Sequence, residues 1–200
     1  TAPKFADAGF IADANGNEQV IFQTTASAVN EVEITNGATG NGPIIGSSGE
    51  TNVDLNLTPK GLGRVTLGAG SIQNVVEKIT VSATAATGTI NFDVITQAVL
   101  FFTSAATGNF TVNFRGDGSN TLNSIMSTGQ SLTVAFLVTN TGTPFFNNAV
   151  TIDGSSVTPE FQGGSAPSAG NANSIDAYTY TIIKTGDATF TTLAAQTQYA

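Results

Sequence analysis

The chain has 200 residues, a length that suits one medium domain or one domain with a smaller module beside it. Hydrophobic residues make up 40% of the sequence, enough to bury a core, while charge is sparse and acidic, with 6 Lys and Arg against 14 Asp and Glu. The scattered cations argue against nucleic-acid binding, and the lack of Cys and His excludes disulfides, thiolate metal sites and the commonest general base.

The N-terminal residues 1–22 are predicted to form a polar arm. The arm ends in a short apolar run at residues 19–22. The sequence Asn-Gly-Asn at residues 15–17 is a turn signal, because Asn and Gly tolerate the positive φ of tight turns. The arm therefore contains one chain reversal before its apolar end.

Residues 23–72 are predicted to form a small β module for attachment or oligomerisation. Apolar and polar residues alternate at 31–35 and 52–58, and a further short apolar pattern lies at 65–67. Strands this short, within some 50 residues, cannot build a self-sufficient core. The module must therefore pack against its own larger domain, identical chains or another protein. We favour packing against identical chains.

Residues 73–200 carry longer strand patterns and are predicted to form a β-sandwich or a jelly-roll-like domain. The sequence Ala-Ala-Thr-Gly occurs at 85–88 and again at 105–108, where we expect the chain to reverse in hairpins. One helical turn is expected at 121–126 and no other helix, so the chain is predicted to be all-β. The predicted strands of this domain cover residues 75–83, 89–95, 98–104, 110–115, 131–139, 144–152, 177–184 and 188–193.

Carboxylates are the main groups from which this sequence could build an active site. Paired carboxylates can hydrolyse glycosides, but none here lies in a recognisable catalytic motif, and most lie beside Gly or Asn in predicted turns. No nucleophile elbow or phosphate-binding loop is present. We therefore predict that the protein is not an enzyme and uses no metal or cofactor. The carboxylates considered are Asp93, Asp117, Asp153, Glu160, Asp176 and Asp187.

Five side chains are candidates for surface contacts. Arg115 and Asp117 belong to an Arg-Gly-Asp sequence in a predicted loop, for which a simple turn is the alternative interpretation. Phe145 and Phe146 are consecutive, so in a strand they point to opposite faces, and an outward ring could contact a sugar or a subunit. Phe161 begins a long, weakly apolar loop that either faces a receptor or neighbour or connects passively.

Two parts of the sequence resemble structural proteins of tailed bacteriophages. Residues 30–45, with Ile-Thr-Asn-Gly-Ala-Thr-Gly, continue through Thr-Asn-Val-Asp-Leu at 51–55 and Pro-Lys-Gly-Leu-Gly-Arg-Val at 59–65, and resemble a module of phage fibre and appendage proteins. Residues 120–186 are similar to terminal domains of virion structural proteins from phages of aquatic bacteria. Fibres usually carry a long repetitive shaft, whereas this chain holds at most one module.

The resemblance implies a virion component, homotrimeric and assembled in the host cytoplasm. A short tail appendage or tail fibre and a capsid decoration protein both fit it. The expected partners are identical chains, other capsid or tail proteins and a host-surface glycan. A carbohydrate-binding adhesive module and a glycan-cleaving spike are the alternatives. No nucleic-acid partner is expected, and no membrane insertion, because no apolar run approaches the ~20 residues that cross a bilayer.

Overall fold

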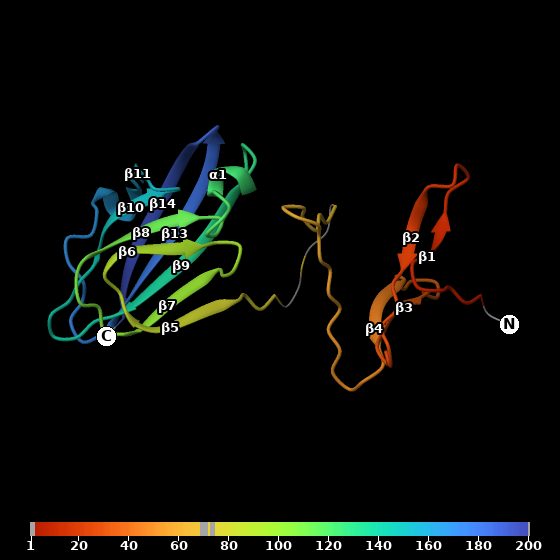
Figure 1. Cartoon of the computed structure of the whole chain (residues 1–200). Coiled ribbons are helices and arrows are strands. Elements are labelled where there is room, and N and C mark those ends of the chain that lie inside the picture. Colours follow the sequence, from red (N-terminus) through yellow and green to blue (C-terminus); the bar gives the residue numbers. More distant parts are fainter. Residues whose placement is uncertain (1–2, 69–71, 73–74, 200) are drawn as a thin grey trace. The chain divides into compact units, whose positions relative to one another are not determined.

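The computed structural model describes residues 3–68, 72 and 75–199. The chain separates into two compact units, Thr1–Gly68 and Ala69–Ala200, which we call unit 1 and unit 2. The regular secondary structure of both units is mainly strand (Figure 1), and helix within the described residues is limited to α1 (Leu122–Ile125) and the 3-10 turn η1 (Gln162–Gly164). The prediction of an all-β chain is confirmed. The sequence predicts that the larger domain begins at residue 73.

Unit 1 contains two antiparallel hairpins. In the first, β1 (Gly9–Ala12) pairs with β2 (Glu18–Phe22), so the predicted arm forms a hairpin. In the second, β3 (Glu31–Thr35) pairs with β4 (Ile44–Ser48). An isolated two-stranded hairpin is at best marginally stable in water, so these elements depend on further packing.

The turn of the first hairpin lies where the sequence predicts it. The Asp13 carboxylate accepts hydrogen bonds from the backbone N–H groups of Asn15 and Asn17, at 2.8 and 2.9 Å. Gly16 adopts a φ of +84°, a left-handed conformation that glycine reaches without a steric penalty. Local side-chain hydrogen bonds and one glycine therefore define this reversal.

Unit 2 consists of two sheets. The four-stranded sheet has the order β11-β10-β8-β6 and the six-stranded sheet the order β12-β14-β13-β9-β7-β5. The strands of the four-stranded sheet are β6 (Gly88–Asp93), β8 (Phe110–Arg115), β10 (Asn147–Ile152) and β11 (Ser155–Val157). Those of the six-stranded sheet are β5 (Ile79–Ala85), β7 (Val99–Ser104), β9 (Ser131–Thr139), β12 (Glu160–Phe161), β13 (Ile175–Gly186) and β14 (Thr189–Tyr199).

From β5 to β10 the chain alternates between the two sheets. Strands β5, β7 and β9 lie parallel and side by side in one sheet, and β6, β8 and β10 do so in the other. Both Ala-Ala-Thr-Gly sequences therefore lead from the six-stranded to the four-stranded sheet, and the prediction that they turn hairpins was wrong. The two crossings stack, because the Thr107 N–H donates to the Ala86 carbonyl at 3.2 Å. Ala86 and Ala106 are both buried at these crossings.

Helix α1 confirms the predicted helical turn, and Thr121 is its N-cap. The Thr121 hydroxyl accepts a hydrogen bond from Ser124 N–H at 3.0 Å. The Asp153 carboxylate accepts from Leu122 N–H at 2.6 Å, and this acidic group suits the positive end of a helix. At the other end the buried Lys184 ammonium donates to the carbonyls of Asn123 and Met126, at 2.6 and 2.9 Å.

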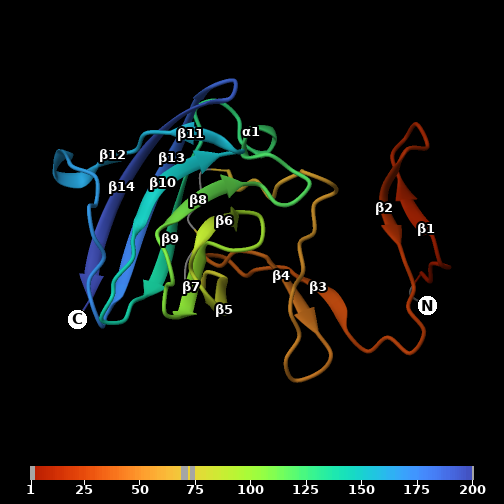
Figure 2. The same cartoon turned by 60° about the vertical axis from the view of Figure 1, so that its left-hand side comes forward.

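Aromatic rings from both sheets meet in one core. The Phe110 ring of β8 lies with its centroid 5.4 Å from Phe136 of β9 and 6.0 Å from Tyr178 of β13. The Phe114 ring lies 4.9 Å from Tyr180. The two sheets of unit 2 therefore pack against each other through their inward faces, as Figure 2 shows.

Candidate functional site

Unit 1 has no core of its own. None of its described residues, 3–68, is buried, and the buried hydrophobic residues that the structure describes lie between Ala86 and Ala194 in unit 2. Large apolar side chains stand exposed on both hairpins and beyond them; Ile34, for example, is 77% exposed. An apolar surface of this extent is a mark of a protein interaction site. We use the name apolar surface of unit 1 for the exposed apolar residues of the second hairpin and the segment after it, which are Val32, Ile34, Ile44, Ile45, Leu55, Leu57, Leu62, Val65 and Leu67.

The β3–β4 hairpin carries four residues of this surface, Val32, Ile34, Ile44 and Ile45. Ile34 is paired with Ile45 across the hairpin and Val32 with Ser47, so Val32, Ile34 and Ile45 share one face. The Ser47 hydroxyl donates to the Val53 carbonyl at 2.8 Å and holds the following segment against this hairpin. The predicted strand at 31–35 is thus present, with its apolar face open to solvent.

The strands predicted at 52–58 and 65–67 do not form. Neither segment pairs with another strand among the residues that the structure describes. Their alternation of apolar and polar residues suits a strand with one buried face, yet Leu57 is 63% exposed. The segment thus has the sequence pattern of a half-buried strand, but within the described residues it is neither paired nor buried.

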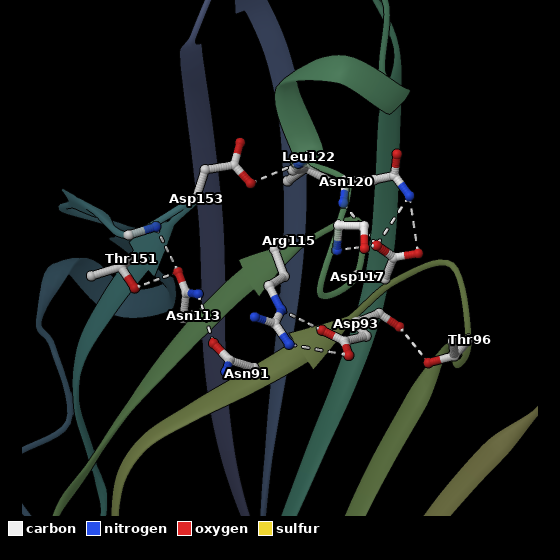
Figure 3. Close-up of polar contacts among 12 residues, drawn as sticks. Asn91, Asp93, Thr96, Asn113, Arg115, Asp117, Asn120, Leu122, Thr151 and Asp153 are labelled. Atoms are coloured by element: carbon white, nitrogen blue, oxygen red, sulfur yellow. Dashed lines mark hydrogen bonds and ion pairs between the residues drawn. The ribbon is translucent and has the colours of Figure 1, made fainter. Parts of the chain in front are cut away.

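Arg115 and Asp117 are held within unit 2, at the end of β8. The Arg115 Nε donates to Asp93 Oδ1 at 2.6 Å, and both side chains are 29% exposed (Figure 3). The Asp117 carboxylate accepts from Ser119 N–H at 2.7 Å and Asn120 N–H at 2.8 Å, which defines the turn. The Ser119 N–H is the main reason that the pKa of Asp117 is lowered. Both charged groups of the Arg-Gly-Asp sequence thus have partners in their own chain.

A row of polar side chains crosses the three parallel strands beside Arg115. The Asn113 amide of β8 donates to Asn91 Oδ1 of β6 at 2.8 Å (Figure 3). Its oxygen accepts from the Thr151 hydroxyl of β10 at 2.8 Å and from the Gly154 N–H at 2.9 Å. Cross-strand pairs of this kind stabilise a sheet, so these side chains link β6, β8 and β10 on the outer face of the four-stranded sheet.

The three candidate phenylalanines occupy different places. The predicted strand at 144–152 begins at Asn147, so Phe145 and Phe146 precede β10 and both pack, partly buried, against the core. Phe161 lies in β12, where it pairs with Ala194 of β14 and also lines a cleft. The five candidate residues therefore lie in three places, at the end of β8, before β10 and in β12.

The buried carboxylate of Asp176 links the segments at Asn140 and Asn171 to the six-stranded sheet. It is not among the five contact candidates. Asp176 Oδ2 accepts from Asn140 Nδ2 at 3.1 Å, Asn171 N–H at 3.0 Å and Gln196 Nε2 at 3.2 Å. Asp176 Oδ1 is buried and has no hydrogen-bond partner among the described residues. Burial raises the pKa of Asp176 above its ordinary value, and it raises that of the neighbouring Tyr178. One feature of the sequence could have indicated that Asp176 is buried. Residues of β13 alternate between the two faces of the strand, and this alternation places Asp176 on the same inward face as Tyr178.

Stability should respond to the protonation of Asp176. Because its folded pKa exceeds 3.8, the folded state binds the proton more tightly than the unfolded state. Its contribution is therefore fully present below pH 3.8 and is lost as the pH rises through the raised pKa. Urea unfolding between about pH 3 and 7 should show Asp176→Asn gaining stability relative to wild type as the pH rises.

Asp117→Asn is the control with the opposite sign. The pKa of Asp117 is lowered, so its contribution is present above pH 3.8 and disappears as the pH falls through the folded value. This variant should lose stability relative to wild type as the pH rises. A free-energy difference for Asp176→Asn that is independent of pH, or that follows Asp117→Asn, would contradict the assignment.

The other carboxylates considered in the sequence have structural partners or stand exposed. Asp93 pairs with Arg115, Asp153 caps α1, and Asp187 accepts from Asn123 Nδ2 at 3.0 Å. The described residues contain no group of three or more acidic side chains placed to hold a metal ion. No helix in this part of the chain is long and apolar enough to cross a membrane. No protein-family model, curated protein or solved structure matches the chain.

Proposed function

We propose that this protein is a structural component of a tailed-phage virion, either a short tail appendage or a capsid decoration protein. In this proposal it acts by assembly and surface contacts and has no catalytic role. The observation that carries it is that no residue described in unit 1, from 3 to 68, is buried, and that part of this segment resembles a phage appendage module. The architecture proposed for unit 2 is a β-sandwich. A jelly roll fits less well because its strands are antiparallel, whereas β5 to β10 pair in parallel.

Unit 1 is proposed to complete its core with two identical chains. Segment 52–58 has a strand pattern without a partner, and Val32, Ile34 and Ile45 offer one apolar face of a hairpin. Burying one such Val or Ile side chain contributes about 1.5–3 kcal/mol, so a few per chain would hold an assembly together. With no cysteine in the sequence, hydrophobic burial and strand pairing between chains would supply the stability. Unit 2 would then present its loops to capsid or tail proteins.

The solution mass of the full chain tests this proposal. Light scattering behind a sizing column should give three times 20.3 kDa, and the mass should persist on dilution. Ile34→Asp places a charge on the apolar face and should reduce the mass to that of one chain. Ile95→Asp is the matched control, because Ile95 is also exposed but lies in unit 2, and it should leave the mass unchanged. A stable, folded wild-type monomer would overturn the trimer.

A further inference from the structure

A cleft opens in unit 2 where the edges of the two sheets come together. Its volume is about 480 Å³, within the range that holds small ligands. Strand β11 is one edge of the four-stranded sheet and β12 one edge of the six-stranded sheet, and Thr158 and Pro159 connect them directly. Strand β10 and the segment 164–167 complete the walls. Every lining residue belongs to unit 2, so the cleft does not depend on the assembly proposed for unit 1.

The cleft has an apolar inner wall and a polar rim. Val157 and Phe161 line it and also pack against the hydrophobic core, which fixes their positions. Asn148, Ser156 and Glu160 line it from exposed positions. The side chains of these three residues form no hydrogen bond within the described part of the chain. Their amide, hydroxyl and carboxylate groups are therefore available to a ligand.

A β-bulge in β10 directs the rim residue Asn148. The pairing of β10 with β8 shifts register between Asn147 and Ala149, which leaves Asn148 as the extra residue. Bulges of this kind re-aim side chains next to binding sites. The bulge is held in place by the buried Asn147, whose Nδ2 donates to the carbonyls of Phe110 and Ala149 at 2.9 and 2.7 Å. Tyr180 Oη donates to Asn147 Oδ1 at 2.7 Å.

The charge of the cleft selects the class of ligand. Glu160 is the one charged residue among those that line it, and no Lys or Arg lines it. An anionic ligand would meet a carboxylate with no cation to balance it, in a chain of net charge −8. A neutral sugar offers hydroxyl groups to the amide, hydroxyl and carboxylate of the rim. Its C–H face offers apolar surface to Phe161 and Val157.

We propose that this cleft binds a neutral saccharide of one or two units. Asn148, Ser156 and Glu160 form the hydrogen-bonding rim, and Phe161 forms the apolar wall. The loss of one rim hydrogen bond, as in Asn148→Ala or Glu160→Gln, should weaken binding by about three- to tenfold. Glu77→Gln is the matched control, because Glu77 is exposed in unit 2 and lies outside the cleft.

Saturation-transfer difference NMR on the full chain tests this inference. The probes are glucose, galactose, N-acetylglucosamine, maltose, cellobiose and lactose, with glucuronate as the anionic comparison. Ala166→Trp fills the cleft from an exposed lining position, and Ser168→Trp places the same ring in the same loop outside it. We expect transfer to at least one neutral sugar, its loss in Ala166→Trp and its retention in Ser168→Trp.

Three results would overturn the inference. These are no transfer to any of the six neutral probes, equal transfer in Ala166→Trp and wild type, and stronger transfer to glucuronate than to glucose. The solution mass of each sample, measured in parallel, reports separately on the assembly of unit 1. A chain of the wrong oligomeric state can thus still bind sugar, and a trimer can fail to bind it, so the two proposals fail independently.

Discussion

Phe136→Ala is expected to lower the free energy of unfolding of unit 2 by about 3–5 kcal/mol. The Phe136 side chain is fully buried, and its ring centroid lies 5.5 Å from that of Phe102 and 5.4 Å from that of Phe110. It therefore contacts rings from both sheets. Truncation removes apolar burial and leaves a cavity that neighbouring strands cannot close. Since domains are stable by only about 5–15 kcal/mol, this one change should take unit 2 close to unfolding at room temperature.

The neighbouring residue provides the matched control. Leu137 follows Phe136 in β9, points to the opposite face of the six-stranded sheet and is only partly buried. Guanidinium unfolding should show Leu137→Ala losing less than half the free energy that Phe136→Ala loses, with similar slopes for both. Equal losses would mean that the outer face of this sheet is packed as tightly as the core, contrary to the structure.

Asn147→Ala is expected to cost unit 2 about 2–4 kcal/mol, although the side chain is polar. The change leaves the carbonyls of Phe110 and Ala149 and the hydroxyl of Tyr180 without the partners that Asn147 gives them. Phe110 and Tyr180 are buried, so a polar atom of theirs without a partner bears its full desolvation penalty, whereas the exposed Ala149 contributes less. Chemical unfolding monitored by tyrosine fluorescence reports the loss.

A double-mutant cycle separates the hydrogen bond from the packing. Tyr180→Phe removes the hydroxyl that donates to Asn147 Oδ1 and keeps the buried ring. In the background of Asn147→Ala this second change should be nearly neutral, because the hydroxyl is already unpaired. The coupling energy between the two residues should be about 1–2 kcal/mol. Strictly additive losses would show that the Asn147–Tyr180 contact contributes nothing to stability.

Much of unit 2 could be predicted from residue alternation alone. In β13 the inward positions hold Tyr178, Tyr180 and Ile182 and the outward positions hold Thr179 and Thr181, a pattern with the period of a strand. The helical turn at α1 was predicted for a similar reason, from local capping chemistry. Both features depend on residues that are close together in the sequence, so one sequence contains the information that predicts them.

Strand pairing could not be predicted in the same way. A Gly-containing turn looks alike whether the chain reverses within a sheet or crosses to another, and at Ala86 and Ala106 it crosses. The strand patterns at 52–58 and 65–67 have a similar ambiguity, because alternation records a buried face but not the partner that buries it.

For the candidate sites too, local sequence indicated some residues, whereas others depend on strand pairing. The Arg115 side chain of the Arg-Gly-Asp sequence forms an ion pair within the chain, because Asp93 lies beside it in the neighbouring strand. Phe161 was singled out from the sequence and does line the cleft. Asn148 was missed, because its role follows from a bulge that exists only in the pairing of β10 with β8. The two adjacent asparagines at the start of β10, Asn147 and Asn148, were the only feature of the sequence that pointed to this role.

The alternation of β5 to β10 between the sheets also bears on how fast unit 2 can fold. Asn91 and Asn113 are neighbours across β6 and β8 but lie 22 residues apart in the chain, and Asn113 and Thr151 lie 38 apart. Each such pairing loses loop-closure entropy before it gains contacts, so we expect refolding in about milliseconds to seconds. The β13–β14 hairpin pairs Lys184 with Phe190 through local contacts and can form early. Until the parallel strands join it, their open edges can pair with other chains, so refolding should give the highest yield at low protein concentration.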